Sequence, residues 1–217
     1  MKKTSEDLQG VIAQMLKPLK NLSLGVVIEG LSNYDVIQFD KTSIKDLKVL
    51  EILKKAANNV TNEVNINGIK RSRPNEVGND IEPFVINELE KLNYKAFIPR
   101  TFDGKSKTTG YPDIEFIDEF GRTHYLECKT YNKKNIATTQ RSFYLSPSKE
   151  FKVTKNAIHF GISFEIFVDK NIGNNRIYKV YNWKILDLSK LELDVKYEFN
   201  SDNKRLYNDD LILSEKQ

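Results

Sequence analysis

The sequence predicts a mixed α/β fold, in which a central mixed sheet is flanked by helices and preceded by an N-terminal helical portion. Apolar residues recur at helical spacing through much of residues 1–60 and again over 79–92. Short apolar runs separated by turn residues begin at residue 113 and dominate the chain from residue 157, where strands are expected over 158–168, 176–186 and 193–199. Helices followed by a hairpin and further strands are typical of a sheet with helices packed on it.

The N-terminal portion is expected to contain helices over residues 8–16 and 44–57, where apolar side chains fall on one face. Residues 58–78 are first rich in Asn and then loop-like, which predicts a joint. We therefore expect two portions. Residues 1–70 form a mainly helical part packed on the core, and residues 71–217 form the core itself with a strand-rich C-terminal part.

The next predicted helix spans residues 79–92. Asp80 is a plausible N-cap, and Pro83 falls in the first turn, where no backbone donor is needed. A short strand is expected over 94–98. Strands over 113–117 and 123–130, with the turn residues Asp118-Glu119-Phe120-Gly121 between them, predict a β-hairpin.

Composition excludes several classes of protein. The 217 residues have a single cysteine, Cys128, so neither a disulfide framework nor a multi-cysteine zinc site is available. The two histidines, His124 and His159, argue against a histidine-built zinc enzyme. The apolar runs are far shorter than the roughly 20 residues that cross a bilayer, and no secretory signal follows Met1. We therefore expect a cytoplasmic protein without membrane association.

The predicted hairpin carries the residues with chemical potential. Because side chains alternate along a strand, Glu127 and Lys129 share one face, while Leu126 and Cys128 point toward the core. A tight hairpin brings Asp113 beside that polar face. Two neighbouring carboxylates without clustered His or Cys favour Mg²⁺ or Mn²⁺ over zinc.

A further acid is expected from the preceding helix. Glu82 lies at the margin of the apolar stripe, where its carboxylate can face the sheet edge near Asp113. Acids are also favoured in the first turn of any helix, because they complement the helix dipole. Glu76 and Asp80 are therefore competing candidates for the same role.

The order Glu82, Pro112-Asp113 and, 14 residues after Asp113, Glu127-Cys128-Lys129 resembles the PD-(D/E)xK nuclease superfamily. The resemblance covers roughly residues 75–168 and is most like a type II restriction endonuclease. It implies a restriction-endonuclease-like core and cleavage of double-stranded DNA to leave a 5′-phosphate and a 3′-hydroxyl.

The resemblance also implies roles for the site residues. Asp113, Glu127 and the backbone carbonyl of Cys128 would bind Mg²⁺, for which Mn²⁺ would substitute. Lys129 would hold the attacking water, and Glu82 would position a second metal or a metal-bound water. A palindromic cut implies a homodimer. A DNA methyltransferase encoded nearby would be the cognate partner.

DNA contacts are expected from the basic stretch that follows the hairpin, where residues 129–155 hold seven basic residues against one acid. The candidate DNA-binding residues are Lys105, Lys107, Lys133, Lys134, Arg141, Tyr144, Lys149 and Lys152. Gln140-x-x-x-Tyr144 also matches a motif of RecB-like nucleases, but Pro147 argues against a helix there. Core packing of Phe143 or Tyr144 is therefore an alternative.

Two other functions are compatible with these residues. One is a different PD-(D/E)xK enzyme that acts in DNA repair or resolves junctions. The other is a DNA-binding relative with an inert site, which the intact Asp113, Glu127 and Lys129 argue against. Discrete cleavage of long DNA would separate the restriction enzyme from both.

Overall fold

The computed structural model describes residues 5–17, 19–139, 142–147, 150–197, 201–206 and 209–211. The chain divides into two compact units, one made of residues 1–22 with 192–217 and the other of residues 23–191. Within the described residues, none of the helices is long and apolar enough to cross a membrane. The first unit contains helices α1 (Ser5–Met15) and α5 (Asn203–Leu206).

The second unit is built on a mixed sheet. In spatial order its main strands are β3 (Ile69–Arg71), β8 (Asn175–Asp187), β7 (Ala157–Ile172), β6 (Thr123–Tyr131), β5 (Ile114–Ile117) and β4 (Lys95–Phe97). Strands β6 and β7 run parallel, whereas the other neighbours in this order are antiparallel. Strand β2 (Val36–Ile37) pairs in parallel with the start of β7, beyond the point where β8 ends. The predicted mixed α/β fold is confirmed.

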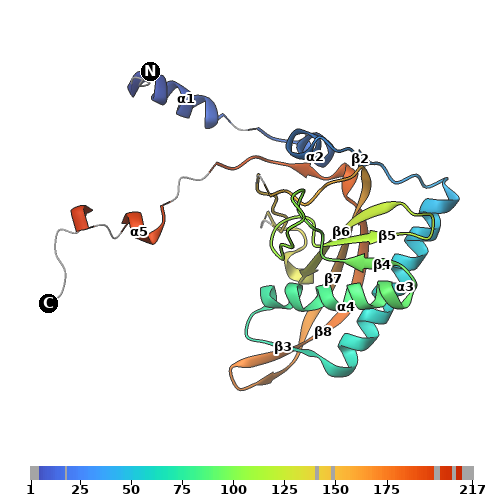
Figure 1. Ribbon diagram of the computed structural model, residues 1–217. Helices are drawn as coiled ribbons and strands as arrows, with labels where there is room; N and C mark the ends of the chain where they lie inside the picture. The colour runs from blue at the N-terminus through green and yellow to red at the C-terminus, as the bar shows by residue number, and fades with distance from the viewer. Residues whose placement is uncertain are drawn as a thin grey trace. The chain divides into compact units, whose positions relative to one another are not determined.

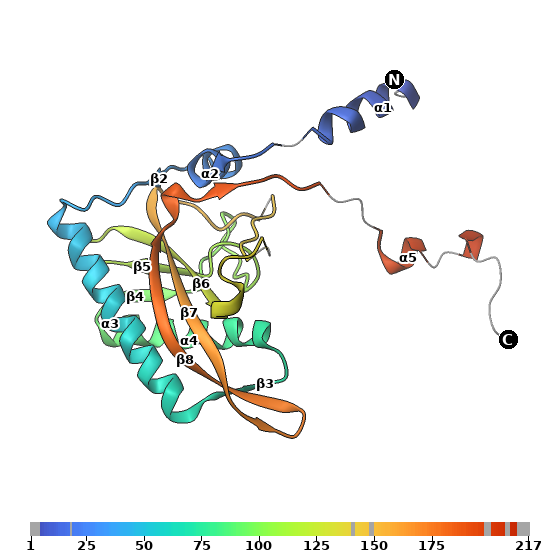
Figure 2. The ribbon, with the colours of Figure 1, turned by 180° about the vertical axis from the view of Figure 1, so that it is seen from behind.

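Three helices accompany this sheet in the same unit: α2 (Leu24–Ser32), α3 (Ile44–Asn67) and α4 (Val77–Lys91). Helix α3 contacts β8, and α4 contacts β4 and β6 (Figure 1). Seen from behind, α3 crosses the back of the strands (Figure 2). Apolar side chains of α3 and α4 form one core with inward-facing residues of the strands, such as Phe160 and Ile162. Helices α3 and α4 therefore cover one face of the sheet, and Glu127 and Lys129 lie on the other.

Helix α3 is ten residues longer than predicted, and it includes the Asn-rich run taken as a joint. Val60 and Val64 continue the buried stripe, which keeps this stretch helical. The asparagines bind other elements instead of ending the helix. The Asn65 amide donates to the carbonyl of Val180 and accepts from the N–H of the same residue, both at 2.8 Å.

Helix α4 begins earlier than predicted, with Glu76 as the residue before its first turn, so Pro83 lies inside the helix. Asp80 is therefore not the N-cap. Its carboxylate instead accepts two hydrogen bonds from the guanidinium of Arg71, at 2.6 and 2.5 Å. The predicted apolar stripe is confirmed, since Ile81, Val85 and Leu89 are fully buried.

The strand predictions hold with changes in length. The hairpin β5–β6 and strand β4 lie where the sequence placed them. Strands β7 and β8 form a longer hairpin than expected, and its far end projects past the helices beside β3 (Figure 2). The strand expected over 193–199 is wrong, because β9 spans only Glu192–Leu193 and residues 194–197 are irregular; residues 198–199 lie outside the described residues.

The remaining elements are short. Strand β1 (Leu22–Ser23) pairs with β9 in a two-stranded sheet. The 3₁₀ segments are Pro74–Glu76, Lys133–Asn135, Leu188–Lys190 and Asp209–Leu211.

Candidate active site at the open end of the hairpin

The hairpin register brings Asp113 beside Glu127. Ile114 pairs with Leu126, so Asp113, one residue before β5, lies next to β6 at the end away from the turn. The backbone N–H of Cys128 donates a hydrogen bond to Oδ2 of Asp113, at 2.8 Å. Leu126 is fully buried and Cys128 is 3% exposed, both within the core. The alternation predicted for this strand is confirmed.

Lys129 links the two carboxylates. Its Nζ donates to Oε1 of Glu127 at 2.5 Å and lies 4.0 Å from Oδ2 of Asp113. Burial lowers the pKa of Lys129, but the charges of Glu127 and Asp113 outweigh it and raise the pKa above its ordinary value. Lys129 therefore stays an ammonium at neutral pH.

Glu127 lacks sufficient positive charge around it. Burial and the charge of Asp113 raise the pKa of Glu127 to about 7, although Lys129 opposes this rise. Its Oε2 is buried without a hydrogen-bond partner among the described residues. A buried carboxylate oxygen of this kind is costly unless a proton or a cation reaches it.

Glu82 faces the same place from α4. Burial, followed by the charge of Asp113, raises the pKa of Glu82 to about 7, while Lys129 and Lys152 lower it. Its two competitors have other partners. Asp80 is paired with Arg71, and Glu76 accepts hydrogen bonds from the Ser72 hydroxyl and a backbone N–H near the start of α4. The geometry therefore supports Glu82 as the helix acid.

Glu127 and Lys129 lie in the wall of an open cleft of about 620 Å³. Its other walls come from the 3₁₀ segment before α4, the loop after β6 and the strands β7 and β8. Ser163, paired with Lys129 across the parallel strands, and Lys184, paired with Ser163, continue the polar lining. The cleft therefore opens onto the Glu127–Lys129 pair.

The donor set fits a hard divalent cation that keeps part of its water shell. Among the described residues, no three His, Cys, Asp or Glu side chains converge tightly enough to enclose an ion by themselves. Asp113 and Glu127 therefore offer two carboxylates, and the remaining ligands would be a backbone carbonyl, waters or a substrate oxygen. Mg²⁺ is commonly bound in this incomplete way.

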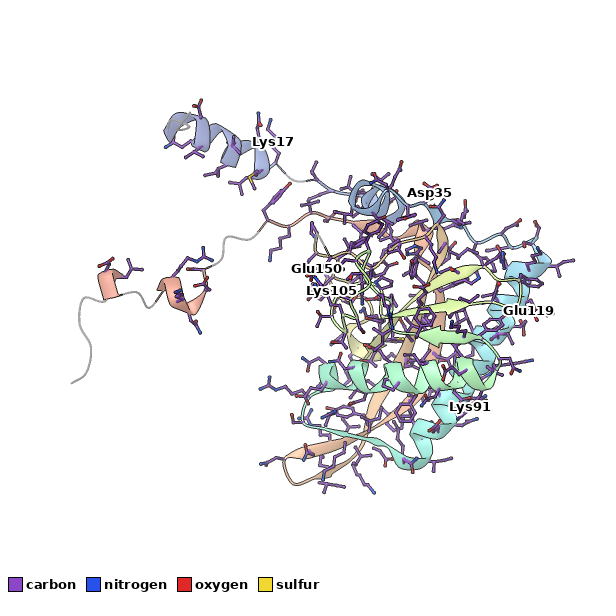
Figure 3. The ribbon with its side chains drawn as sticks, in the orientation of Figure 1. Lys17, Asp35, Lys91, Lys105, Glu119 and Glu150 are labelled. Atoms are coloured by element: carbon purple, nitrogen blue, oxygen red, sulfur yellow. The ribbon has the colours of Figure 1, made fainter. Side chains whose placement is uncertain are left out.

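The candidate DNA-binding residues lie in different settings. The Nζ of Lys105 lies 3.9 Å from Oε1 of Glu150, and the two residues are neighbours in Figure 3. The Nζ of Lys107 lies 3.2 Å from Oε2 of the same glutamate. Lys133 and Lys134 are exposed on the loop that borders the cleft. Arg141 and Lys149, as well as Gln140 of the RecB-like motif, lie outside the described residues.

Phe143 and Tyr144, the two aromatic residues for which the sequence predicts either core packing or a surface role, have different surroundings. Phe143 packs edge-on against Tyr111, with ring centroids 5.3 Å apart, whereas Tyr144 is 58% exposed. Tyr111 is itself held by a hydrogen bond between its hydroxyl and Nδ1 of His159, at 2.5 Å. Phe143 therefore takes the packing role, and Tyr144 lies largely exposed at the surface.

Lys152 differs most from expectation. The sequence suggested a surface lysine, but its side chain is 1% exposed and lies near Glu82, Asp113 and Glu127. The sequence holds one local indication of this burial, since Lys152 stands between Phe151, which is half-buried, and Val153, which is buried. An apolar neighbour on each side favours burial of the intervening stem, but it does not predict which groups the ammonium meets.

Two neighbouring carboxylates, a lysine bonded to one of them and a third acid nearby are the kind of groups found in metal-dependent nucleases. The model of the type II restriction enzyme MjaV family matches residues 18–210. The chain is also 40% identical over 226 residues to the type II restriction enzyme MjaV of Methanocaldococcus jannaschii, an alignment that covers 97% of this chain and 96% of that protein. No solved structure matches the chain. The chain belongs to the type II restriction enzyme MjaV family, and the resemblance to restriction enzymes found in its sequence is confirmed.

Proposed function

We propose that this protein is a Mg²⁺-dependent restriction endonuclease that cuts double-stranded DNA at a specific sequence, with its active site at Asp113, Glu127, Lys129 and Glu82. Family membership supports site-specific DNA cleavage. The observation that carries the location is the placement of Asp113 and Glu127 beside each other, with Lys129 bonded to one and near the other. In this proposal the sheet is the core of a restriction-endonuclease-like fold.

Asp113, Glu127 and the carbonyl of Cys128 would hold Mg²⁺, with Mn²⁺ as a substitute. When bound, the ion supplies a lowered pKa for a water molecule and stabilises charge on the phosphate. Lys129 would orient the attacking water and stabilise the negative charge that develops on it, since its Nζ already lies between the two carboxylates. Glu82 holds a further water or ion on the α4 side. Hydrolysis leaves a 5′-phosphate and a 3′-hydroxyl.

The DNA would lie in the cleft, with its phosphates contacted by basic residues on the surrounding loops. Phosphate contacts need only basic side chains and backbone amides, so they position the duplex without reading its sequence. The exposed Lys133 and Lys134, at the border of the cleft, are the best placed of the described candidates. A double-strand cut at a palindrome uses two such sites, so we propose a homodimer in the cytoplasm, with a DNA methyltransferase as its cognate partner.

The test is to incubate the purified full chain with long DNA in the presence of Mg²⁺, Mn²⁺ or EDTA. We expect discrete fragments with either metal and none with EDTA. Direct religation by DNA ligase would verify the expected 5′-phosphate and 3′-hydroxyl ends. Preferential cutting of flaps or junctions would instead support a repair nuclease. DNA binding without any cutting would indicate an inert relative.

A further inference from the structure

Lys152 presents a buried positive charge without a protein partner. Its side chain is 1% exposed, and its Nζ finds no hydrogen-bond acceptor among the described residues. The other lysines near the site do have partners: Lys129 bonds to Glu127 at 2.5 Å, and Lys107 pairs with Glu150 at 3.2 Å. Burying an ammonium without a partner is unfavourable, so a group absent from the free protein is expected to complete this one.

The charges that surround Lys152 belong to the candidate active site. Its charged form is favoured by the carboxylates of Asp113, Glu127 and Glu82, and it is disfavoured by the positive charge of Lys107. Burial lowers the pKa of Lys152 below its ordinary value, and the three carboxylates oppose that effect. The lysine therefore faces the carboxylate cluster without an ion pair to any single member. Among the described residues, Lys152 forms no structural salt bridge.

We propose that Lys152 is a second catalytic lysine, whose ammonium binds a non-bridging oxygen of the scissile phosphate. This inference rests on the proposed phosphodiester cleavage at Asp113 and Glu127. The two lysines then have separate tasks. Lys129 is held by Glu127 beside the water, whereas Lys152 has no bond to give up before it binds the phosphate. A positioned cation stabilises the charge that develops on the phosphate during attack.

The first experiment compares Lys152→Met with Lys95→Met in single-turnover cleavage. Lys95 is exposed on β4 and takes no part in the site, so it is the matched control for loss of one lysine. We expect Lys152→Met to cleave about 10²–10³-fold more slowly, the usual effect of removing one positioned donor, and Lys95→Met to cleave at the wild-type rate. Cleavage by Lys152→Met within threefold of wild type would overturn the proposal.

The second experiment asks whether the lysine contacts that particular phosphate. The scissile bond is first mapped from the ends of wild-type products, and that phosphate is then replaced by a neutral methylphosphonate. Binding is measured in Ca²⁺ for wild type and Lys152→Met on both DNAs. The replacement should weaken binding by wild type clearly more than binding by the variant, because only wild type has the ammonium to lose a partner. Equal weakening would place Lys152 elsewhere.

A purely structural role for Lys152 would lower stability without producing this coupling to one phosphate. If Lys152→Met fails to fold, as judged by circular dichroism, Lys152→Gln carries the same two comparisons with a polar side chain of similar length. Failure of the broader proposed function is distinguishable, since wild type itself would then produce no discrete fragments.

Discussion

The two ends of the β5–β6 hairpin both hold buried carboxylates, but they satisfy them differently. At the turn end, Oδ1 of Asp118 accepts hydrogen bonds from the backbone N–H groups of Phe120 and Arg122, at 2.9 and 2.8 Å. Its Oδ2 bonds to Nε of Arg122 at 2.8 Å and lies 3.0 Å from Nε2 of His124. At the open end, Oε2 of Glu127 has no partner among the described residues.

The pKa shifts follow this contrast. Burial raises the pKa of Asp118, but hydrogen bonds from His124 and Arg122 outweigh it and bring the pKa below its ordinary value. Asp46 of α3 behaves in the same way, because Arg122 bonds to it at 2.6 Å. Glu127 moves in the opposite direction, to about 7. Fixed hydrogen bonds make the turn end a stabilising network. They are scarce at the open end, where we propose that a cation and a phosphate bind.

After Asp113→Ala, which should lose all cleavage, Lys129→Met should lose the most activity. Methionine keeps the length of the side chain but removes the ammonium that serves the water. Cleavage should fall by about 10²–10³-fold, the usual cost of removing one positioned donor that stabilises developing charge. Single-turnover kinetics with Mg²⁺ measure it.

Cys128→Ser is the control from the opposite face of the same strand. Its hydroxyl would enter the core and cost about 1–3 kcal/mol if unpaired, but the cleavage rate of the folded protein should hardly change. Lost cleavage in a Cys128→Ser protein as stable as its parent would contradict the assignment of faces.

At the turn end of the hairpin, we expect a substitution to lower stability rather than activity. Asp118→Ala leaves Arg122 and His124 without their shared carboxylate, so the free energy of unfolding should drop by about 3–5 kcal/mol. Urea unfolding followed by circular dichroism measures the drop. The folded fraction should still cleave DNA. A stable but inactive Asp118→Ala protein would remove the distinction between the two ends.

Glu82→Ala should have a smaller effect on cleavage, about tenfold or 1.4 kcal/mol of activation free energy. The residue lies at the margin of the site, and the protein should remain folded because Glu82 stands at the edge of the buried stripe of α4. Asp80→Ala and Glu76→Ala are the controls on the same helix end. A larger loss of rate in either control would show that the helix acid is misassigned.

The smallest expected effect concerns pH. Folding raises the pKa of Glu127 from 4.5 to about 7, so its contribution to stability is fully present below pH 4.5 and is lost as the pH rises through 7. In EDTA, the free energy of unfolding of wild type relative to Glu127→Gln should therefore increase by about 1 kcal/mol between pH 8 and pH 6. If the difference in free energy of unfolding stayed constant from pH 8 to pH 6, folding would not raise the pKa of Glu127.

The sequence was sufficient to predict the hairpin and the grouping on it, because strand alternation and a short turn fix which side chains meet. It was less informative where tertiary contacts override local preference. The Asn-rich end of α3 stays helical because Val60 and Val64 are buried and Asn65 binds the backbone of β8. The position of Lys152 depends on the path of an irregular loop, and no periodic pattern records that path.

Cleavage by Asp113→Ala tests the central claim most directly. The variant should retain the wild-type unfolding midpoint and bind DNA, because removing a carboxylate reduces repulsion of the phosphates. In the presence of Mg²⁺ it should produce none of the discrete fragments that wild type produces from long DNA. Wild-type fragments from Asp113→Ala at ordinary Mg²⁺ concentrations would show that the open end of the hairpin is not the active site.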